Sequence, residues 1–504
     1  MGCPRHQRSA RDPLCGGSAQ HRTRSRDQIL SVPGAAHDYA GGSAAGSRLY
    51  AHGVLALLVL AYGFNILDRT MIAIVGQAIK VDMKLSDAEL GLLGGFAFAI
   101  LYSTLGLPIA RLAERWNRVS IIAIAMVIWS GFTAACGAAS GFVQLLMMRI
   151  GVGMGEAGLS PPAFSLISDY YPPQRRASAL SIYTLGGAIG TMIGGALGGW
   201  LAKTFGWRAA FFFIGAPGIV LAIVIKLLIR EPARGALDLS TSIQPESAAR
   251  PFDLGEELSE LGQTCREMLR DRVVLHMVLG LTLSSVATYS LLQFVPAYFI
   301  RAFDLDYATV GVIFGLTNGL SAAVGVVLGG FVTDWLGQHD ARWRALVPAI
   351  GLIIAAPIYW IVFTRPDWRI AAAILFAPGI FQFLSHGPTF GAVQNAFPPH
   401  RRATATALML LFLTLVAAGG GPPLIGWIID RFAEAHFAAM PGIHDHFSAM
   451  CVTGKAPPAA GSALAASCQD ALARATRGGL FVSIAFLVWG GLHFAIAGLR
   501  RPAL

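Results

Sequence analysis

Twelve long apolar stretches constrain the fold of this 504-residue chain more than any other feature. A helix needs about 20 mostly apolar residues to cross a bilayer. The stretches cover residues 51–78, 89–110, 119–139, 142–169, 177–201, 208–229, 273–299, 308–333, 345–363, 369–396, 403–429 and 479–499. Charged residues make up only 13% of the chain, about half the share typical of a soluble domain. We therefore expect an all-α polytopic membrane protein with twelve transmembrane helices.

Several function classes lack their signatures in this sequence. There is no phosphate-binding Gly-x-x-x-x-Gly-Lys-Ser/Thr loop, and the six cysteines show neither CxxC nor Cys/His metal spacing. We find no nucleophile–base constellation, so we expect no enzyme, no metal and no cofactor other than a proton as coupling ion. The net charge is +10, and the basic residues occur in short groups between apolar runs. This distribution is typical of loop arginines rather than of nucleic-acid binding.

The distribution of basic residues predicts the orientation. If the N-terminus is cytoplasmic, the short inside segments carry Arg111, Arg115, Arg118, Arg175, Arg176, Arg342, Arg344, Arg401, Arg402, Arg500 and Arg501. The outside loops carry fewer: Lys80, Lys84, Lys203, Arg208, Arg301, Arg365 and Arg369. Cytoplasmic loops are usually the more basic ones. We therefore expect a multi-pass protein of the cell (inner) membrane with both termini in the cytoplasm.

Two segments are not read as membrane spans. Residues 1–50 are rich in Arg, Gly and Ser, and we expect a disordered cytoplasmic tail or an over-extended translation start. In the cytoplasmic linker, residues 230–272, apolar positions recur at helical spacing: Leu254, Leu258, Leu261, Cys265 and Met268. With Asp253 as N-cap and Glu256 as its capping-box partner, this predicts a short amphipathic helix on the membrane face. The alternative is a solvated linker with chance periodicity.

The chain also repeats itself. Residues 172–179 recur as residues 398–405, Gly199-Trp200 recurs as Gly426-Trp427, and Glu114 is matched by Asp334. The three offsets are nearly equal, which indicates two six-helix halves in the same orientation, residues 51–229 and 273–504. The second half includes an extracytoplasmic loop over residues 430–478. Two parallel six-helix halves are the architecture of the major facilitator superfamily.

Individual motifs resemble that superfamily. Residues 110–118 resemble its loop 2–3 signature, Gly-x-Leu-Ala-Asp-Arg-x-Gly-Arg, and depart from it at Ala110, Glu114 and Asn117. Residues 149–157 resemble the fourth-helix motif, and the Gly-rich residues 186–201 stand where the fifth-helix motif belongs, with Gly194-Gly195 in place of Gly-Pro. Residues 65–69 (Asn-Ile-Leu-Asp-Arg) and 153–162 are similar to the spinster-like branch. The resemblance covers residues 51–430 and implies secondary transport, proton-linked in bacterial members and of lysolipids or sphingoid phosphates in eukaryotic ones.

Four ionisable residues lie deep in predicted spans: Asp68, Arg69, Arg149 and Glu156. A charge at the bilayer centre costs about 3 kcal/mol or more, so these side chains should face a cavity or one another. Arg149 and Glu156 share one face of the fourth helix, two turns apart, and Asp68 can approach both if the first and fourth helices line the cavity. We expect Asp68 and Glu156 to carry protons and Arg149 to switch between partners. The alternative is a fixed ion-pair network without coupling.

Further polar residues are candidates for substrate binding. Arg69 is a candidate anion or headgroup contact, or a second ion-pair partner. The second half places polar side chains on its spans: Tyr289, Gln293, Asn318, Gln382 and His386. Each can line a cavity or simply pack in the bundle, and a lone histidine is often a hydrogen-bonded packing residue.

Charges at the cytoplasmic helix ends are candidates for gating. The superfamily resemblance implies that Glu114 faces the helix start near residues 401–404 and that Asp334 faces the start near residues 175–178. An acid near a helix N-terminus gains about 0.3–1 kcal/mol from the helix dipole. The gating set is Glu114, Arg115, Arg118, Asp334, Arg175 and Arg401. The alternative is that these charges only set topology.

Cys451 and Cys468 are the only cysteines in the predicted outside loops. Two cysteines 17 positions apart in an oxidising compartment favour a disulfide, although unpaired thiols are the alternative. For the whole chain we expect a monomeric proton-driven secondary transporter of an organic solute, with amphipathic and lipid-like molecules among the candidates. The rivals are an exporter of drugs or lipids that is uncoupled or driven by another ion, and a transport-inactive sensor or scaffold.

Overall fold

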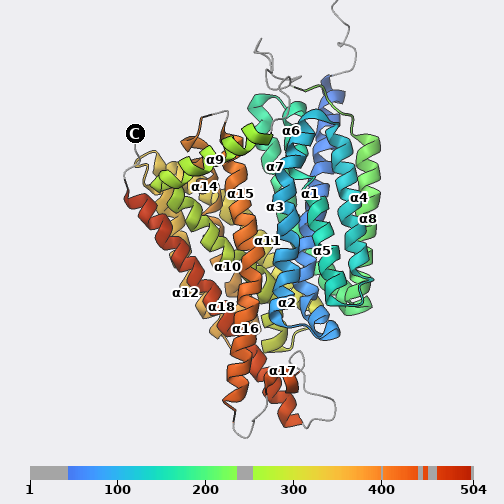
Figure 1. Ribbon diagram of the computed structural model, residues 1–504, viewed down its shortest axis with the longest axis vertical. Helices are drawn as coiled ribbons and strands as arrows, with labels where there is room; N and C mark the ends of the chain where they lie inside the picture. Colours follow the sequence, from blue (N-terminus) through green and yellow to red (C-terminus); the bar gives the residue numbers. More distant parts are fainter. Residues whose placement is uncertain (1–43, 235–253, 399–400, 441–445, 452–461, 501–504) are drawn as a thin grey trace, which may run out of the picture. The chain divides into compact units, whose positions relative to one another are not determined.

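Long apolar runs become continuous helices because a helix satisfies every backbone polar group internally where no water is available. The computed structural model describes residues 44–234, 254–398, 401–440, 446–451 and 462–500. These residues form helices and connecting turns and contain no strand, which confirms the all-α expectation. Leu49–Leu504 form one compact unit (Figure 1).

The first half of this unit contains α1 to α8. Their bounds are α1 Ala44–Met83, α2 Asp87–Gly91, the π-helical segment η1 Leu92–Phe96, α3 Ala97–Arg115, α4 Arg118–Cys136, α5 Phe142–Glu156, α6 Ser160–Tyr170, α7 Pro173–Phe205 and α8 Trp207–Leu228. The linker helix α9 spans Leu254–Arg270.

The second half contains α10 to α18. Their bounds are α10 Arg272–Phe303, α11 Tyr307–Gly337, α12 Trp343–Thr364, α13 Trp368–Phe383, α14 His386–Ala396, α15 Arg402–Phe412, the π-helical segment η4 Leu413–Gly420, α16 Gly421–Ala438, α17 Phe447–Met450 and α18 Ser462–Leu499.

Eleven of the described helical stretches are long and apolar enough to cross a membrane. The remaining expected span, residues 142–169, is divided into α5 and α6 by a turn just before Pro161. The second half repeats this interruption between α13 and α14. The count of twelve spans is therefore consistent with the structure, and the shared break supports the internal repeat.

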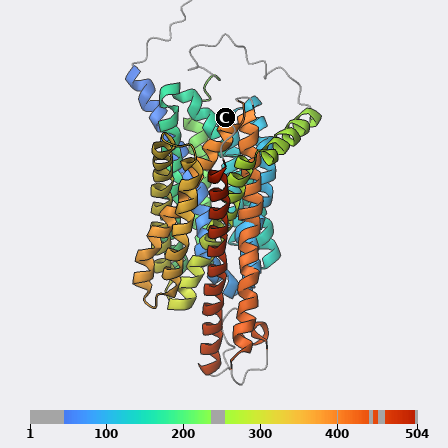
Figure 2. The same cartoon turned by 90° about the vertical axis from the view of Figure 1, so that its left-hand side faces the viewer.

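The structure corrects the expected loop over residues 430–478. α16 continues to Ala438, α17 follows, and α18 begins at Ser462. α16 and α18 run on past the ends of the other helices in both views (Figure 1, Figure 2). The segment is rich in alanine, which has the highest helix propensity but contributes little to a search for long apolar runs.

Polar caps and one glycine shape the connections between helices. Asp306 accepts backbone N–H bonds from Ala308 and Thr309 at 2.9 and 3.1 Å. The bond from Thr309 holds the pKa of the Asp306 carboxyl below its usual range. Between α7 and α8, Gly206 adopts a φ of 84°, a conformation that side chains with a Cβ rarely adopt. Helices that are antiparallel neighbours are thus joined by very short turns.

The two halves approach most closely through glycines. A Cβ added at Gly195 of α7 would lie 2.5 Å from the carbonyl oxygen of Gly311 of α11, and one added at Gly95 of η1 would lie 2.4 Å from that of Ala418 of η4. Only glycine permits backbones this close. Both contacts lie toward the end of the unit where α1 and α10 finish and which carries α17. We call it the disulfide end, and the opposite end, with α9, the linker end (Figure 2).

Parts of the expected tail and linker lie outside the described residues. This applies to residues 1–43 of the tail and to Asp253, the expected N-cap. α1 begins at Ala44, so residues 44–50 are helical rather than part of a tail. α9 occupies the position of the predicted amphipathic helix and packs against α10 and α15, with Met268 buried at 3% exposure.

Candidate functional site

Asp68 and Arg149 form a buried ion pair between α1 and α5. Arg149 Nη1 donates to Asp68 Oδ2 at 3.0 Å, and the Thr133 hydroxyl of α4 donates to Asp68 Oδ1 at 3.0 Å. Asp68 and Arg149 are each 1% exposed. Because an isolated charge is strongly disfavoured at such a depth, the three side chains hold α1, α4 and α5 together.

Arg69 and Glu156 form a second ion pair between the same two helices. Arg69 Nε donates to Glu156 Oε2 at 2.6 Å. The guanidinium carbon lies 4.2 Å from the ring centre of Phe98 and 4.7 Å from that of Tyr102, both on α3. The side chain of Arg69 is 22% exposed, whereas that of Glu156 is 0% exposed. Arg69 is therefore the member of the four-residue cluster that a solute can reach.

The pairing differs from the simplest sequence expectation. Asp68 does not bridge Arg149 and Glu156, because Glu156 is bonded to Arg69 instead. Two consecutive residues of α1 thus engage two residues that lie seven positions apart on α5. The four charges neutralise one another in two separate pairs, and Arg69 takes the role of a second ion-pair partner.

Three polar atoms in and beside this cluster are buried and have no hydrogen-bond partner in the described structure: Asn65 Nδ2, Arg149 Nε and Glu156 Oε1. Buried polar atoms are nearly always bonded, so such atoms need a functional or solvent explanation. Glu156 Oε1 is an acceptor without a donor. A proton on this oxygen would leave the bond from Arg69 to Oε2 in place.

The equivalent region of the second half is polar but uncharged. Gln382 accepts a hydrogen bond from the Tyr359 hydroxyl at 2.7 Å and donates one to Thr288 Oγ1 at 2.6 Å. Together with Asn318 these side chains line a cavity of about 20 Å³, about the size of a water site. Gln382 and Asn318, both predicted to line a substrate cavity, are therefore brought together.

The other predicted binding residues of the second half do not line this small cavity. Gln293 is 4% exposed and reaches from α10 into the first half, where a Cβ added at Gly94 would lie 2.0 Å from its Oε1. Tyr289 is half-buried on α10. His386 is half-buried beside Phe383, with ring centres 5.3 Å apart.

Arg118 is an organising residue of the first half. It is 1% exposed and donates to Glu231 Oε1 at 2.6 Å, to Asp169 Oδ2 at 2.5 Å and to the Ser165 hydroxyl at 2.7 Å. Ser165 and Asp169 belong to its own half, and Glu231 lies at the start of the linker. In this structure Arg118 braces the linker end of the first half.

The predicted cross-half contacts at the linker end are not formed between the described residues. Glu114 pairs with Arg111 of its own helix at 3.5 Å. Arg401 pairs with Glu267 of α9 at 2.9 Å. The remaining gating candidates, Arg115, Arg175 and Asp334, are exposed. The physical reason is that the close glycine contacts between the halves lie toward the opposite end.

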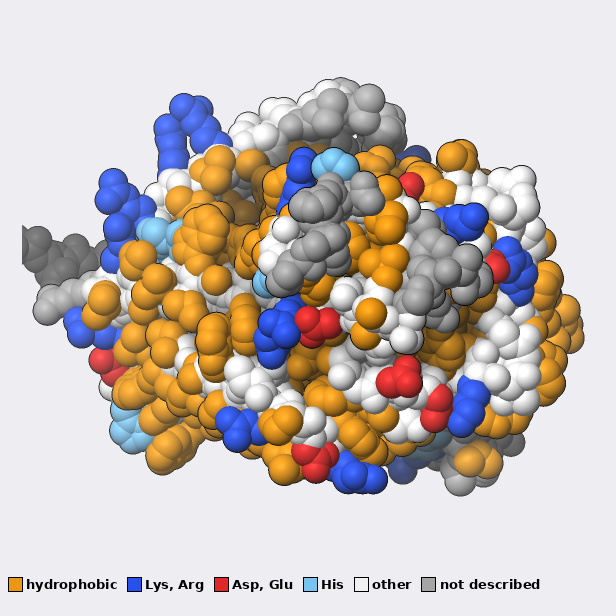
Figure 3. Space-filling view, turned by 90° about the horizontal axis from the view of Figure 1, so that it is seen from below, with side chains coloured by type: hydrophobic (Ala, Val, Ile, Leu, Met, Phe, Trp, Pro, Cys, Tyr) orange, Lys and Arg blue, Asp and Glu red, His pale blue; other side chains and the backbone are white. Residues whose placement is uncertain are grey.

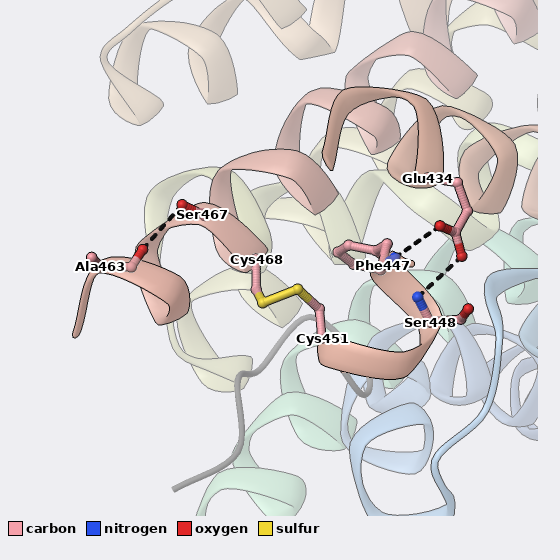
Figure 4. The surroundings of a disulfide bond; sticks show 7 residues. All are labelled: Glu434, Phe447, Ser448, Cys451, Ala463, Ser467 and Cys468. Carbon is pink, nitrogen blue, oxygen red and sulfur yellow. Dashed lines mark hydrogen bonds between the residues drawn. A yellow bond between two sulfur atoms is a disulfide. The ribbon is translucent and has the colours of Figure 1, made fainter. Parts of the chain in front are cut away.

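A disulfide joins Cys451 to Cys468 at the disulfide end, with Cα atoms 5.4 Å apart (Figure 4). Glu434 of α16 accepts the backbone N–H groups of Phe447 and Ser448 at 2.8 and 3.0 Å. The bridge and this cap tie α17 to both α16 and α18. The pair lies in a helical hairpin rather than in the loose loop expected from the sequence.

Sequence reasoning missed several of these contacts. Phe98 and Tyr102 are four residues apart on α3, an aromatic spacing that places both on one helix face. Nothing in the sequence indicates that Thr133 bonds to Asp68. Lys80 and Arg301 were assigned to outside loops, but they are 3% and 5% exposed and therefore do not act as loop charges. No group of three or more His, Cys, Asp and Glu side chains in the described residues is arranged to hold a metal.

An all-helical bundle of two repeated halves, with ion pairs buried between its helices, has the architecture of a polytopic membrane transporter. The chain belongs to the Major Facilitator Superfamily, whose family model matches residues 58–422. This confirms the family and the fold of two parallel six-helix halves.

Known relatives agree with this membership. An MFS-type efflux pump of Mycolicibacterium smegmatis is 29% identical over 405 residues, which cover 80% of this chain and 90% of that protein. A probable L-galactonate transporter of Escherichia coli is 26% identical over 377 residues, which cover 74% of this chain and 82% of that protein. The crystal structure of a bacterial homolog of the human lysosomal transporter spinster, inward-facing and unoccupied, is 30% identical, with a TM-score of 0.75 over 90% of this chain and 99% of that one. The resemblance to the spinster-like branch is thereby confirmed.

Proposed function

We propose that this protein is a proton-coupled secondary transporter of an organic solute that carries an anionic group, and that Arg69 binds this group. The proposal rests on one observation. In the Arg69–Glu156 pair, a partly exposed cation is bonded to a fully buried carboxylate.

The coupling follows from competition for one guanidinium. An anion that binds Arg69 takes over the bond to Nε that Glu156 holds at 2.6 Å. Glu156 is then a buried carboxylate without its counter-charge, a state that strongly favours protonation. One proton therefore enters with each bound anion, and the two travel together as symport. Release of the anion returns Arg69 to Glu156 and expels the proton.

Asp68 and Arg149 supply a second titratable pair within the same helices. When Glu156 is protonated, the cluster of Asp68, Arg69 and Arg149 gains positive charge, which the bound anion balances. The Thr133 hydroxyl donates to Asp68 and holds this carboxylate in place. We assign Asp68 to the proton path. Arg149 is the ion-pair partner that Asp68 loses when it is protonated.

The solute class combines an anionic group with an apolar or carbon-rich body. Arg69 provides the charge, and the rings of Phe98 and Tyr102 beside it offer stacking surfaces. Sugar acids carry the anionic group although their bodies are polar, and one relative carries the name of a probable L-galactonate transporter. Lysolipids with an anionic headgroup fit both parts of this description.

For the orientation, we propose that the linker end is cytoplasmic and that the protein works as a monomer in the cell (inner) membrane. The excess of basic residues at that end supports the assignment. With this orientation the glycine contacts close the outer side, so that the structure corresponds to an inward-facing state, as in the spinster homolog.

The test is solute-dependent proton movement in proteoliposomes loaded with a pH-sensitive dye. A library of sugar acids, anionic lysolipids and cationic drugs is added outside while the membrane potential is clamped. We expect the lumen to acidify with at least one anionic solute and not with the cations. Transport of radiolabelled solute without any pH change would favour the uncoupled rival, and no transport of any solute would favour the sensor or scaffold.

A further inference from the structure

A second buried charge cluster lies at the disulfide end, away from the candidate site. Asp87, the first residue of α2, is 0% exposed, and two cations share its carboxylate. Lys80 Nζ of α1 lies 2.5 Å from Oδ2, and Arg301 Nη2 of α10 lies 2.6 Å from Oδ1. Each oxygen of Asp87 thus has its own cation.

Arg301 connects the two halves through this cluster. In addition to the bond from Nη2 to Asp87, Arg301 Nε donates to Gln77 Oε1 of α1 at 2.8 Å. Arg301 therefore binds the first half at two residues. Its Nη1 donates to Thr476 Oγ1 of α18, within its own half, at 2.8 Å. Arg301 itself is 5% exposed, which means that water does not weaken these bonds.

A reciprocal contact runs from the second half to the same residue. Asp430 of α16 accepts the backbone N–H groups of Asp87 and Ala88, both at 2.9 Å. The backbones are also close there, because a Cβ added at Gly426 would lie 2.1 Å from the carbonyl oxygen of Asp87. Asp87 is therefore held by its side chain and by its backbone from the opposite half.

The cluster contains bonds within one half, which persist when the halves separate, and bonds between the halves, which do not. Lys80–Asp87 lies within the first half and Arg301–Thr476 within the second, so both survive separation. The bonds that Arg301 donates to Asp87 and Gln77, and those that Asp430 accepts from the start of α2, must break. Asp87 keeps Lys80 as its counter-charge, and Arg301 keeps its hydrogen bond to Thr476 while separation of the halves exposes its guanidinium to water, so the cluster can open reversibly.

We propose that Asp87, Arg301 and Asp430 form a gate that closes the transport path at the disulfide end, and that breaking their cross-half bonds is required to expose the central site on that side. The gate depends on alternating access between two halves but not on proton coupling. Charged pairs on the exposed face of this end are different in kind. Basic side chains lie beside most of the acidic ones there (Figure 3), and Lys203–Asp306, at 3.3 Å, also joins the two halves but has side chains 54% and 41% exposed.

This contrast supplies a matched control. Arg301→Gln removes the buried cation of the gate, and Lys203→Gln removes an exposed cation that also crosses between the halves. Arg301→Gln leaves the Lys80–Asp87 pair intact, so it avoids an unpaired buried acid. Asp87→Asn is the second test variant, because it removes the central carboxylate but strands two cations.

The measurement is hydrogen–deuterium exchange of the full-length protein in lipid nanodiscs, without solute or pH gradient. In Arg301→Gln and Asp87→Asn we expect backbone amides of residues 87–96 and 290–303 to exchange about threefold or more faster than in wild type. Lys203→Gln should match wild type. Unchanged exchange in Arg301→Gln, or an equal rise in the first turns of α4 at the linker end, roughly residues 118–124, would overturn the gate. The outcome does not depend on whether protons are coupled, so it is separable from failure of the proposed function.

Discussion

Glu156 Oε2 accepts a hydrogen bond from Arg69 at 2.6 Å, whereas Glu156 Oε1, equally inaccessible, has no partner in the described residues. One oxygen thus carries the counter-charge contact and the other is left for a proton. This division of roles within one carboxylate is the basis of the coupling mechanism, because an anion at Arg69 disturbs the first oxygen and thereby favours protonation of the second.

The first prediction concerns the pH dependence of solute binding. In wild type, anion binding requires Glu156 to take up a proton, so affinity should fall by up to about tenfold per pH unit once Glu156 is ionised in the free protein. In Glu156→Gln the amide is neutral at every pH, and affinity should stay constant. Isothermal titration calorimetry between pH 5.5 and 8.5 measures the difference. A Glu156→Gln variant that keeps the wild-type pH profile would remove Glu156 from the proton path.

The second prediction concerns Asp68. Asp68→Asn imitates the protonated state and should prevent pH-gradient-driven accumulation of solute, with a loss of about tenfold or more, while solute exchange across the membrane persists. Uptake and counterflow assays in proteoliposomes separate the two activities. Asp470→Asn is the control, since that carboxylate is exposed and pairs with Arg474 of its own helix. Full gradient-driven accumulation by Asp68→Asn would contradict its role.

The third prediction separates the charge of Arg69 from its shape. Lysine retains the positive charge but cannot stack its flat face on Phe98 and Tyr102 or place a guanidinium fork between two partners. We expect Arg69→Lys to raise the apparent KM by about tenfold, and Phe98→Leu to raise it by a smaller factor. Concentration series of solute uptake test this, with the exposed Arg474→Lys as control. Equal KM values in Arg69→Lys and wild type would show that the solute does not contact Arg69.

The fourth prediction concerns the Cys451–Cys468 bridge. Closing a loop of 17 positions restricts the unfolded chain by about 3 kcal/mol in the chain-entropy model. The double variant Cys451→Ser/Cys468→Ser should therefore unfold at a lower temperature, with the change confined to the hairpin of α16, α17 and α18. Membrane-impermeant maleimide applied to intact cells should label these cysteines only after reduction. Labelling without reduction would argue against the bridge, and no labelling after reduction would argue against an outside location.

The sequence predicts much of the fold because its determinants are local. Apolar runs of about 20 residues, repeated motifs and glycine-rich spans specify helices and halves without knowledge of their packing. The buried charges Asp68 and Glu156 are likewise evident from their position in apolar spans. Their actual partners are not, because pairing depends on how each helix is rotated about its axis.

The remaining features depend on the assembled halves. Lys80 and Arg301 lie near helix ends. At such positions the sequence does not distinguish a charged side chain that faces water from one that faces the opposite half. Their burial follows only from the approach of α2 to α10 and α16. The extension of α16 and α18 is missed for a different reason, since alanine-rich segments form helices without long apolar runs.

Coupling between Arg69 and Glu156 is tested most directly by the number of protons taken up when solute binds to purified protein in weakly buffered solution. A pH indicator records the change on addition of an anionic solute that proteoliposome assays identify. We predict an uptake of about one proton per bound solute in wild type at a pH where Glu156 is ionised in the free protein, and none in Glu156→Gln. Binding without proton uptake in wild type, or an uptake that persists unchanged in Glu156→Gln, would contradict this coupling.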